Sequence, residues 1–346
     1  MIVKAGETGR SVWARGLAVI LFVLLVGGCA GFRESTISVG GADGKWAALL
    51  IELRDFERRI GFVGTNNFTV LSASQRAYPF CGYVSRLVLP YSYEDPAIVW
   101  LDQVSEDECR ARGRDADVYV GESEALGEIG APVTHDMING KLDRFIYLIL
   151  HEDCHDQYEL PYGIEEALCN LIAYKAMIVF AAEKYGANTA EYREVRSYAE
   201  TQAGVSFATV VHYERLATLY VRYGRNEISQ DVLLRERAAI FINAMNALRR
   251  SEGQLNNLSI ANQMTYSRHY PVMESAYDTL GRDVGRTVAF FREVDRIKPS
   301  TGDILKRLVT TDEAGVEFIR GRESALVEVI RNASERRRDR PQNGTR

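Results

Sequence analysis

The chain lacks any excess of basic residues: it has 42 Lys and Arg against 47 Asp and Glu, a formal net charge of −5. Nucleic-acid-binding proteins concentrate positive charge, so this balance argues against a nucleic-acid partner. Beyond the first 30 residues, no uncharged apolar stretch reaches the length that crosses a membrane. We find no internal repeat, and only five histidines occur in 346 residues. A motif that needs two histidines is therefore rarely a chance event here.

The one long apolar run, residues 17–26, follows three basic residues and leads into Gly27-Gly28-Cys29. A charged start, a short apolar core and small residues are typical of a secretory signal rather than a membrane-spanning helix. Residues 26–29 resemble a bacterial lipobox, which implies cleavage after residue 28 and lipidation of Cys29. An ordinary signal peptide with a chance cysteine is the alternative.

The lipobox resemblance also implies a location. Residue 30 is Ala rather than Asp, which by analogy with lipoprotein sorting in Gram-negative bacteria favours the periplasmic face of the outer membrane. We therefore expect a lipid bilayer as a partner, contacted through lipidated Cys29. Residues 29–44, rich in Gly, Ser and Thr, read as a tether.

The sequence His151-Glu152-Asp153-Cys154-His155 is an H-E-x-x-H motif that follows an apolar run. On a helix, residues four apart share a face, so His151 and His155 can bind one metal ion. Glu152 then lies where it can take a proton from a metal-bound water. A surface helix with a chance match, and a former enzyme that kept its fold, are the alternatives. Burial of two histidines and a glutamate without a metal would be costly.

Zinc at a catalytic site needs a third protein ligand, and Glu166 is the candidate. It opens a second apolar helix, 164–185, after a turn at Pro161 and Gly163 that ends the first helix. The sequence thus predicts one Zn²⁺ per chain. We assign Glu165 no ligand role, because it lies about 100° around the helix from Glu166.

Four cysteines remain after Cys29: Cys81, Cys109, Cys154 and Cys169. An even number in an exported chain suggests two disulfides, with three possible pairings. Cys154 and Cys169 lie on the two helices that carry the predicted ligands, so we favour Cys154–Cys169 with Cys81–Cys109. Four buried free thiols are the alternative.

The predicted fold class is α+β and predominantly α. Hydrophobic periodicity predicts a helix over 45–60, then a small sheet of three to five strands, and then the metal helix over about 141–156. Strand-like segments cover 68–71, 83–89, 98–101 and 117–120. We expect a catalytic lobe at 45–185, an all-α lobe at 186–331 and a disordered tail at 332–346.

These features resemble the gluzincins, zinc peptidases whose third ligand is a glutamate on the next helix. More narrowly, the chain is similar to the aminopeptidase lipoproteins of bacterial envelopes. That family joins a lipobox, an H-E-x-x-H motif, a following tyrosine, a glutamate helix and a late N-N block that ends in tyrosine. The corresponding segments here are residues 26–29, 151–155, Tyr158, 165–169 and 256–266. The resemblance implies a zincin-like lobe.

The resemblance also implies roles for two further residues. Asn170 stands where the gluzincins carry an acidic residue that braces a ligating histidine from outside the metal shell. Tyr266, at the end of the late block, is the candidate donor to the oxyanion, with His269 as the runner-up. A tyrosine in the core is the alternative interpretation of Tyr266.

The function that we expect is hydrolysis of peptide bonds in a peptide or protein substrate, with Glu152 as general base. An edge strand of the sheet could bind an extended substrate. Two alternatives stay open. One is an inactive lipid-anchored binding or scaffold protein on a zincin fold, and the other is an amide hydrolase that acts on peptidoglycan peptides.

Overall fold

The computed structural model describes residues 43–72, 78–101, 104–123, 130–251 and 253–338. The predicted signal segment, Cys29 and nearly all of the tether lie outside the described residues. The described residues group into one compact unit by their contacts. Within the described part of the chain, no helix combines the length and the apolar character needed to span a membrane.

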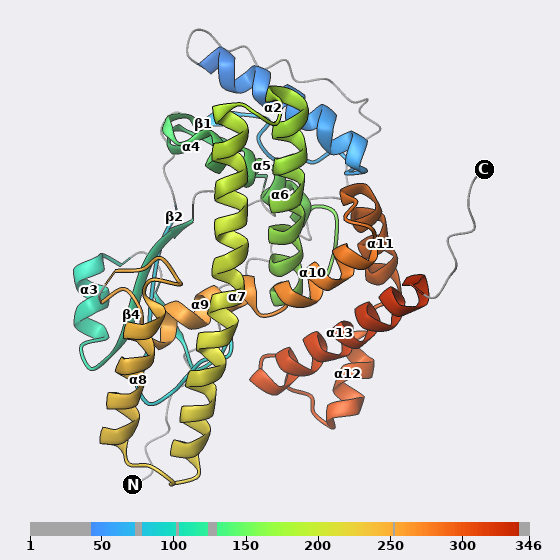
Figure 1. The fold of residues 1–346 in the computed structure, drawn as a ribbon. Helices are drawn as coiled ribbons and strands as arrows, with labels where there is room; N and C mark the ends of the chain where they lie inside the picture. The colour runs from blue at the N-terminus through green and yellow to red at the C-terminus, as the bar shows by residue number, and fades with distance from the viewer. Residues whose placement is uncertain (1–42, 73–77, 102–103, 124–129, 252, 339–346) are drawn as a thin grey trace, which may run out of the picture. The chain divides into compact units, whose positions relative to one another are not determined.

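Helices dominate the described residues (Figure 1). The helices of the first half are α2 (Asp43–Ile60), α3 (Glu106–Arg112), α4 (His135–Asn139), α5 (Leu142–His155) and α6 (Tyr162–Tyr185). The later helices are α7 (Ala190–Gly224), α8 (Gln230–Ala244), α9 (Asn257–Ser267), α10 (Tyr270–Thr279), α11 (Val284–Ile297), α12 (Thr301–Leu308) and α13 (Val316–Arg338).

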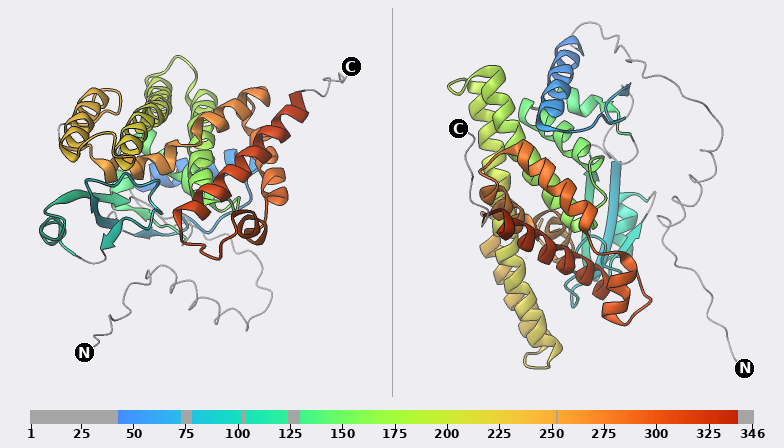
Figure 2. Two further views of the ribbon diagram at one scale, coloured as in Figure 1. Left: turned by 90° about the horizontal axis from the view of Figure 1, so that it is seen from below. Right: turned by 90° about the vertical axis from the view of Figure 1, so that its right-hand side faces the viewer.

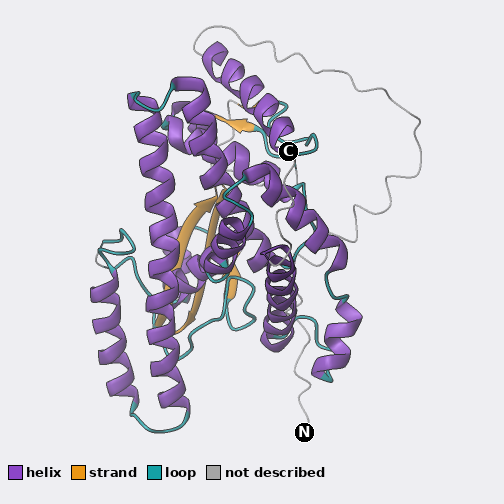
Figure 3. Ribbon diagram, turned by 45° about the vertical axis from the view of Figure 1, so that its right-hand side comes forward, coloured by secondary structure: helices purple, strands orange, loops and turns teal. Residues whose placement is uncertain are grey.

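The strands form two small sheets. β2 (Tyr78–Ser85) lies between β3 (Val99–Leu101) and β4 (Ala116–Ser123) in an antiparallel sheet of order β3-β2-β4. β1 (Leu71–Ser72) and β5 (Val133–Thr134) make a short parallel pair. Figure 3 shows this pair apart from the larger sheet and close to α2. The predicted fold class, α+β with a predominance of helix, is confirmed.

Helix α6 lies at the centre of the helical layer. It packs against α5, α7, α9, α10 and α11, and the two views of Figure 2 place the three-stranded sheet to one side of these helices. A helix that is apolar on all sides is expected to be buried, and most of α6 is. Helix α7 runs past α6, and its far half pairs with α8 (Figure 1).

Several predicted boundaries differ from the structure. Short helices α3 and α12 were not predicted, because seven or eight residues carry too few turns for a clear period. The residues 332–338, predicted to be disordered, belong to α13. Gly186 caps the end of α6, and α7 and α9 of the predicted all-α lobe pack directly on α6. The strand predicted over 83–89 stops at Ser85, and that over 68–71 is a turn as far as Val70.

Candidate metal centre

The H-E-x-x-H motif forms the last turn and a half of α5, and a tight connection turns the chain back into α6. Pro161 occupies the N-cap position of α6 without a side-chain capping hydrogen bond, and its fixed backbone prevents α5 from continuing into α6. Because both helices are buried along most of their length, apolar packing fixes them against each other. This arrangement brings His151, His155 and Glu166 together, and all three are buried.

The three side chains present their ligand atoms as a small triangle. His151 Nε2 lies 3.4 Å from His155 Nε2, and Glu166 Oε2 lies 3.2 Å from the first and 3.5 Å from the second. A tetrahedral zinc with bonds of ~2.0–2.1 Å separates its ligand atoms by about 3.3–3.4 Å. Glu166 Oε2 is also buried without a hydrogen-bond partner. The donor set and its spacing therefore fit a zinc ion.

The charges of the triad depend on one another. Burial favours the neutral form of Glu166, but the adjacent His155 and His151 outweigh it, so the pKa of Glu166 is lowered. Burial likewise favours neutral His155, yet the carboxylates of Glu166 and Glu165 raise the pKa of His155 well above its ordinary value. A metal ion binds neutral imidazole, so its binding would release a proton and strengthen as pH rises.

Different groups hold the two histidine rings. Glu165 Oε1 lies 2.9 Å from His155 Nδ1, and its other oxygen accepts the Leu160 N–H. The ring of His151 stacks on Tyr147, with centroids 5.1 Å apart and planes 26° apart. Such outer contacts fix ring orientation around a metal. The sequence assigns Glu165 no ligand role, but in the structure Glu165 orients the ring of His155.

Asn170 lies close to the centre, but its side-chain hydrogen bonds go to Tyr147 and to the Tyr266 carbonyl rather than to a histidine. Its Oδ1 accepts a hydrogen bond of 2.7 Å from the Tyr147 hydroxyl. Asn170 therefore supports His151 only indirectly, through the stacked Tyr147 ring. The direct brace that the resemblance implied for Asn170 is provided by Glu165 instead, and it acts on His155.

A cavity of about 250 Å³ opens beside the triad, and His151, Glu152 and Tyr266 all line it. Tyr266 lies near the end of α9. The carboxylate of Glu166, burial and the carboxylate of Glu152 raise its pKa well above the ordinary value, so its hydroxyl stays protonated and can donate. The structure therefore brings the predicted base and the predicted donor to one cavity with His151, the member of the metal triad that lines it.

The two asparagines of the late block anchor the helix that carries Tyr266. Asn256 caps the N-terminus of α9, in a capping box with Ser259, and donates from Nδ2 to the Val118 carbonyl of β4. Asn257 donates from its backbone N–H to Asp117 and from its side chain to the Val88 carbonyl. These contacts tie α9 to the sheet, and Tyr266 follows at the other end of the helix.

His269, the alternative donor, is engaged elsewhere. Its Nε2 lies 2.8 Å from a carboxylate oxygen of Glu323 on α13, which also accepts a hydrogen bond of 2.6 Å from Tyr91. Glu323 packs so closely on Gly163 that a Cβ there would lie 2.4 Å from Glu323 Oε1. His269 thus joins the junction of α9 and α10 to α13, and it is not among the residues that line the cavity.

Both predicted cysteine pairs lie at disulfide distance. Cys154 pairs with Cys169, with Cα atoms 5.4 Å apart, and Cys81 pairs with Cys109, with Cα atoms 6.4 Å apart. The first pair joins α5 to α6, and the second joins β2 to α3. The pairing favoured from sequence is confirmed.

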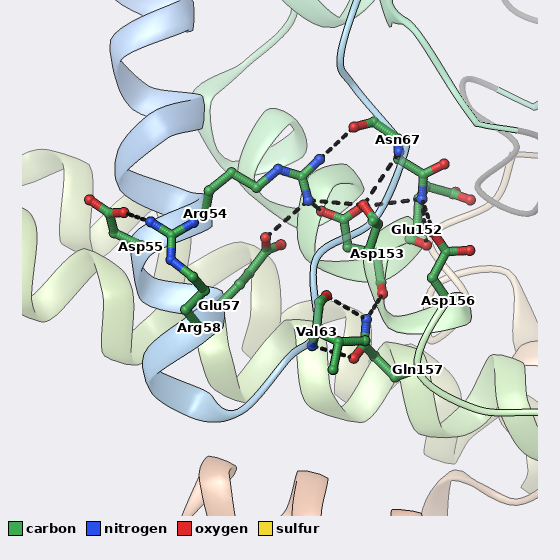
Figure 4. Close-up of polar contacts among 11 residues, drawn as sticks. Arg54, Asp55, Glu57, Arg58, Val63, Asn67, Glu152, Asp153, Asp156 and Gln157 are labelled. Atoms are coloured by element: carbon green, nitrogen blue, oxygen red, sulfur yellow. Dashed lines mark hydrogen bonds and ion pairs between the residues drawn. The ribbon is translucent and has the colours of Figure 1, made fainter. Parts of the chain in front are cut away.

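The face of α5 that points away from the metal carries a buried polar network (Figure 4). Asp153, inside the motif, is 0% exposed. It forms an ion pair with Arg54 of α2 and accepts a 2.6 Å hydrogen bond from Thr65. Asn67 donates to Asp153 and to the backbone carbonyl of Glu152. Glu57, also of α2, lies beside this pair.

These supporting residues were not found from the sequence, although weak signals existed. Tyr147 precedes His151 by one helical turn, which places the two rings on one face. Asp153 is a charged residue inside a helix read as buried, so it needed a partner. Nothing local pointed to Arg54, which is 99 residues away along the chain.

Comparison with protein-family models, with curated proteins and with solved structures finds no match to this chain.

Proposed function

We propose that the chain is a zinc-dependent peptidase, of the gluzincin type that its motifs resemble. The observation that supports this most is the triangle of His151, His155 and Glu166, together with a cavity that His151 and Glu152 line. Among the described residues, this is the one group of three or more His, Cys, Asp or Glu side chains close enough to hold a metal ion.

Different residues around the cavity would carry out different steps of amide hydrolysis. A zinc ion on the triad would supply Lewis acidity to water and to the scissile carbonyl. Glu152 accepts the proton of the attacking water and passes it to the leaving amine. Tyr266, held as a protonated phenol, donates a hydrogen bond to the developing oxyanion.

The edge of the sheet offers a place for an extended substrate. Among the described strands, β4 pairs only with β2, so its second edge has no strand beside it. Tyr119 and Glu122 of β4 line the same cavity as His151 and Glu152. A peptide added along β4 would therefore bring a scissile bond toward the triad.

Glu94 favours a more specific reaction, the removal of N-terminal residues. It lies in the loop whose Tyr93 ring faces Tyr162, 6.2 Å away, at the start of α6. The residue is exposed as a whole, but burial of its carboxyl and the nearby Glu323 raise its pKa to about 7. The carboxylate of Glu166 also raises this pKa, so Glu94 lies near the metal triad and its carboxylate could bind a substrate's free amine. Aminopeptidase action is our second candidate.

We place this activity in the bacterial cell envelope, anchored by lipid at Cys29 on the periplasmic face of the outer membrane. The lipobox-like residues 26–29 support this, together with two cysteine pairs at disulfide distance, since disulfides persist in exported proteins.

The decisive experiment separates a base from a ligand. Glu152→Gln keeps size but removes basicity, so zinc content should stay near one per chain while peptide hydrolysis falls by about 10²–10⁴. Glu166→Gln should lower both zinc affinity and rate, because a neutral amide is a poor ligand for zinc. Zinc is measured by elemental analysis, and the rate with a fluorogenic peptide.

Glu159→Gln is the matched control, because Glu159 is exposed in the turn after the motif and should change neither quantity. Full activity of Glu152→Gln would disprove the mechanism. Zinc binding without any turnover would favour the scaffold alternative. Preference for peptidoglycan stem peptides over linear peptides would favour the second alternative.

A further inference from the structure

The Cys154–Cys169 disulfide lies immediately beside the metal triad. Cys154 precedes His155 directly, and Cys169 follows Glu166 by three residues. Both cysteines are 0% exposed. Their Cα atoms are 5.4 Å apart. Because each Cα lies about 2.3 Å from its helix axis, this distance corresponds to ordinary helix packing and places the two cysteines on the facing sides of α5 and α6.

The metal triad depends on how these two helices lie. His151 and His155 belong to one helix, so the separation of their rings follows from helical geometry and rotamer choice. Glu166 belongs to the other helix, and its 3.2 and 3.5 Å distances to the two rings exist only while α5 and α6 keep their relative position. A link between the helices therefore controls the third ligand and not the first two.

The position of the Cys154–Cys169 disulfide determines how strongly it restrains Glu166 relative to the two histidines. When one packed helix rotates or slides against another, atoms near a fixed point move least. The disulfide fixes such a point one residue from His155 and about one turn from Glu166. The loop 156–161 also joins the helices, directly after His155, but its six residues make a longer connection between His155 and Glu166 than the disulfide does.

We propose that Cys154 and Cys169 are positioning residues for the metal triad, and that their disulfide sets the zinc affinity of the site. This inference rests on the metal centre proposed above. It assigns the disulfide an effect on zinc binding that is separate from its contribution to the stability of the fold.

The second disulfide provides an internal control. Cys81–Cys109 joins β2 to α3 and touches neither ligand-bearing helix through its own bond. Its cysteines are 28 residues apart, against 15 for Cys154 and Cys169. Since stabilisation through the unfolded chain grows with loop length, Cys81–Cys109 should stabilise the fold at least as much.

The test compares the full-length wild type with Cys154→Ala/Cys169→Ala and with Cys81→Ala/Cys109→Ala. Zinc affinity is measured by competition with a chromophoric chelator, and the stability of the metal-free proteins by urea unfolding. We expect the first variant to bind zinc about 10–100-fold more weakly, the range for residues that orient metal ligands. The second should keep its zinc affinity within about twofold, while losing as much metal-free stability or more.

Zinc affinity that falls equally in both variants, or in neither, would overturn the inference. If the alanine pair does not fold, Cys154→Ala/Cys169→Val restores part of the lost volume and carries the same measurement. A wild type that binds no zinc would overturn the metal centre together with this inference. A wild type that binds zinc, with an unchanged first variant, would overturn the positioning role alone.

Discussion

Glu165 and Glu166 are neighbours in the sequence but meet different atoms of His155. Glu166 lies 3.5 Å from Nε2, on the metal side of the ring, and Glu165 lies 2.9 Å from Nδ1, on the other side. The rotation of about 100° between adjacent helical residues separates the two carboxylates in this way. Glu165 thereby fixes which nitrogen of His155 faces the metal.

Glu165→Gln should consequently lower zinc affinity by about 10–100-fold while the protein stays folded, because the amide orients His155 less strongly than a carboxylate does. Glu166→Gln should lower it further. Chelator competition on both variants gives the comparison. Unchanged affinity in Glu165→Gln would show that the contact with His155 is dispensable.

Glu94 leads to a prediction about pH. Its pKa is raised to about 7, so its carboxyl gains charge as pH rises through 7, whereas a peptide's α-amine loses its charge only near 7.7–8.0. If Glu94 binds that amine, KM for a free-amine peptide should fall between pH 6 and about 7.5. Steady-state kinetics of the wild type and Glu94→Gln over this range are the measurement.

An N-acetylated version of the same peptide is the control for this effect. It carries no amine, so Glu94→Gln should leave its KM unchanged at every pH. A KM profile for the free-amine peptide that Glu94→Gln does not alter would rule out the amine-binding role and leave endopeptidase action.

At the scale of elements, α5 is held on two faces. One face presents the metal triad with α6, and the other is held to α2 by the Arg54–Asp153 ion pair and by Asn67 (Figure 4). The Arg54 guanidinium contacts two buried carboxyls, those of Asp153 and Glu57. Glu57 Oε2 lies 3.1 Å from Arg54 Nη1. Burial and the charge of Asp153 raise the pKa of Glu57 well above its ordinary value, against the effect of Arg54.

Arg54→Met should therefore destabilise the fold by about 3–5 kcal/mol, the usual cost of leaving a buried charge unpaired. A carboxyl with a raised pKa binds its proton more tightly when folded, so its contribution to stability falls as pH rises above the unfolded value of ~4.3. Without Arg54 this fall becomes steeper. Arg54→Met should therefore lose more free energy of unfolding at pH 8 than at pH 5, as measured by urea unfolding.

Arg58→Met is the control on the same helix. Arg58 pairs with Asp55 on the surface, and the two side chains are 66% and 54% exposed. Exposed pairs of this kind contribute about 0–1 kcal/mol. Similar losses in the two variants, or a loss in Arg54→Met that does not depend on pH, would contradict the account of the buried network.

At the scale of the whole molecule, the described residues place the candidate site where distant parts of the chain meet. α5 and α6 supply the ligands, α9 supplies Tyr266, and β4 lines the cavity. The C-terminal helix α13 adds Glu323, which packs on the start of α6. Because α13 supports the site, truncation before α13 should not leave an intact metal centre.

The lipid anchor is a prediction about the whole protein that the described residues do not reach. Expressed in a Gram-negative host, the wild type should partition with membranes, and Cys29→Ser should stay uncleaved or be released. Fractionation and intact mass separate these outcomes. Identical behaviour of the two forms would reject lipidation at Cys29.

The sequence by itself determined the features that depend on local period. The four-residue spacing of His151 and His155 places both rings on one helical face wherever that helix lies, and the Pro-Gly turn starts the next helix near Glu166. Because the same two helices carry Cys154 and Cys169, their pairing could also be inferred, and the structure confirms it. The α+β class followed from the same periodicities.

Only the tertiary structure decided what surrounds the ligands. The partner of Asp153 comes from Arg54, 99 residues earlier, and that of His269 comes from Glu323, 54 residues later. Glu165 and Asn170 both lie on α6, yet only the rotation of α6 against α5 directs Glu165 to His155 and Asn170 to Tyr147. Contacts of this kind depend on helix packing and chain topology, which local periodicity does not encode.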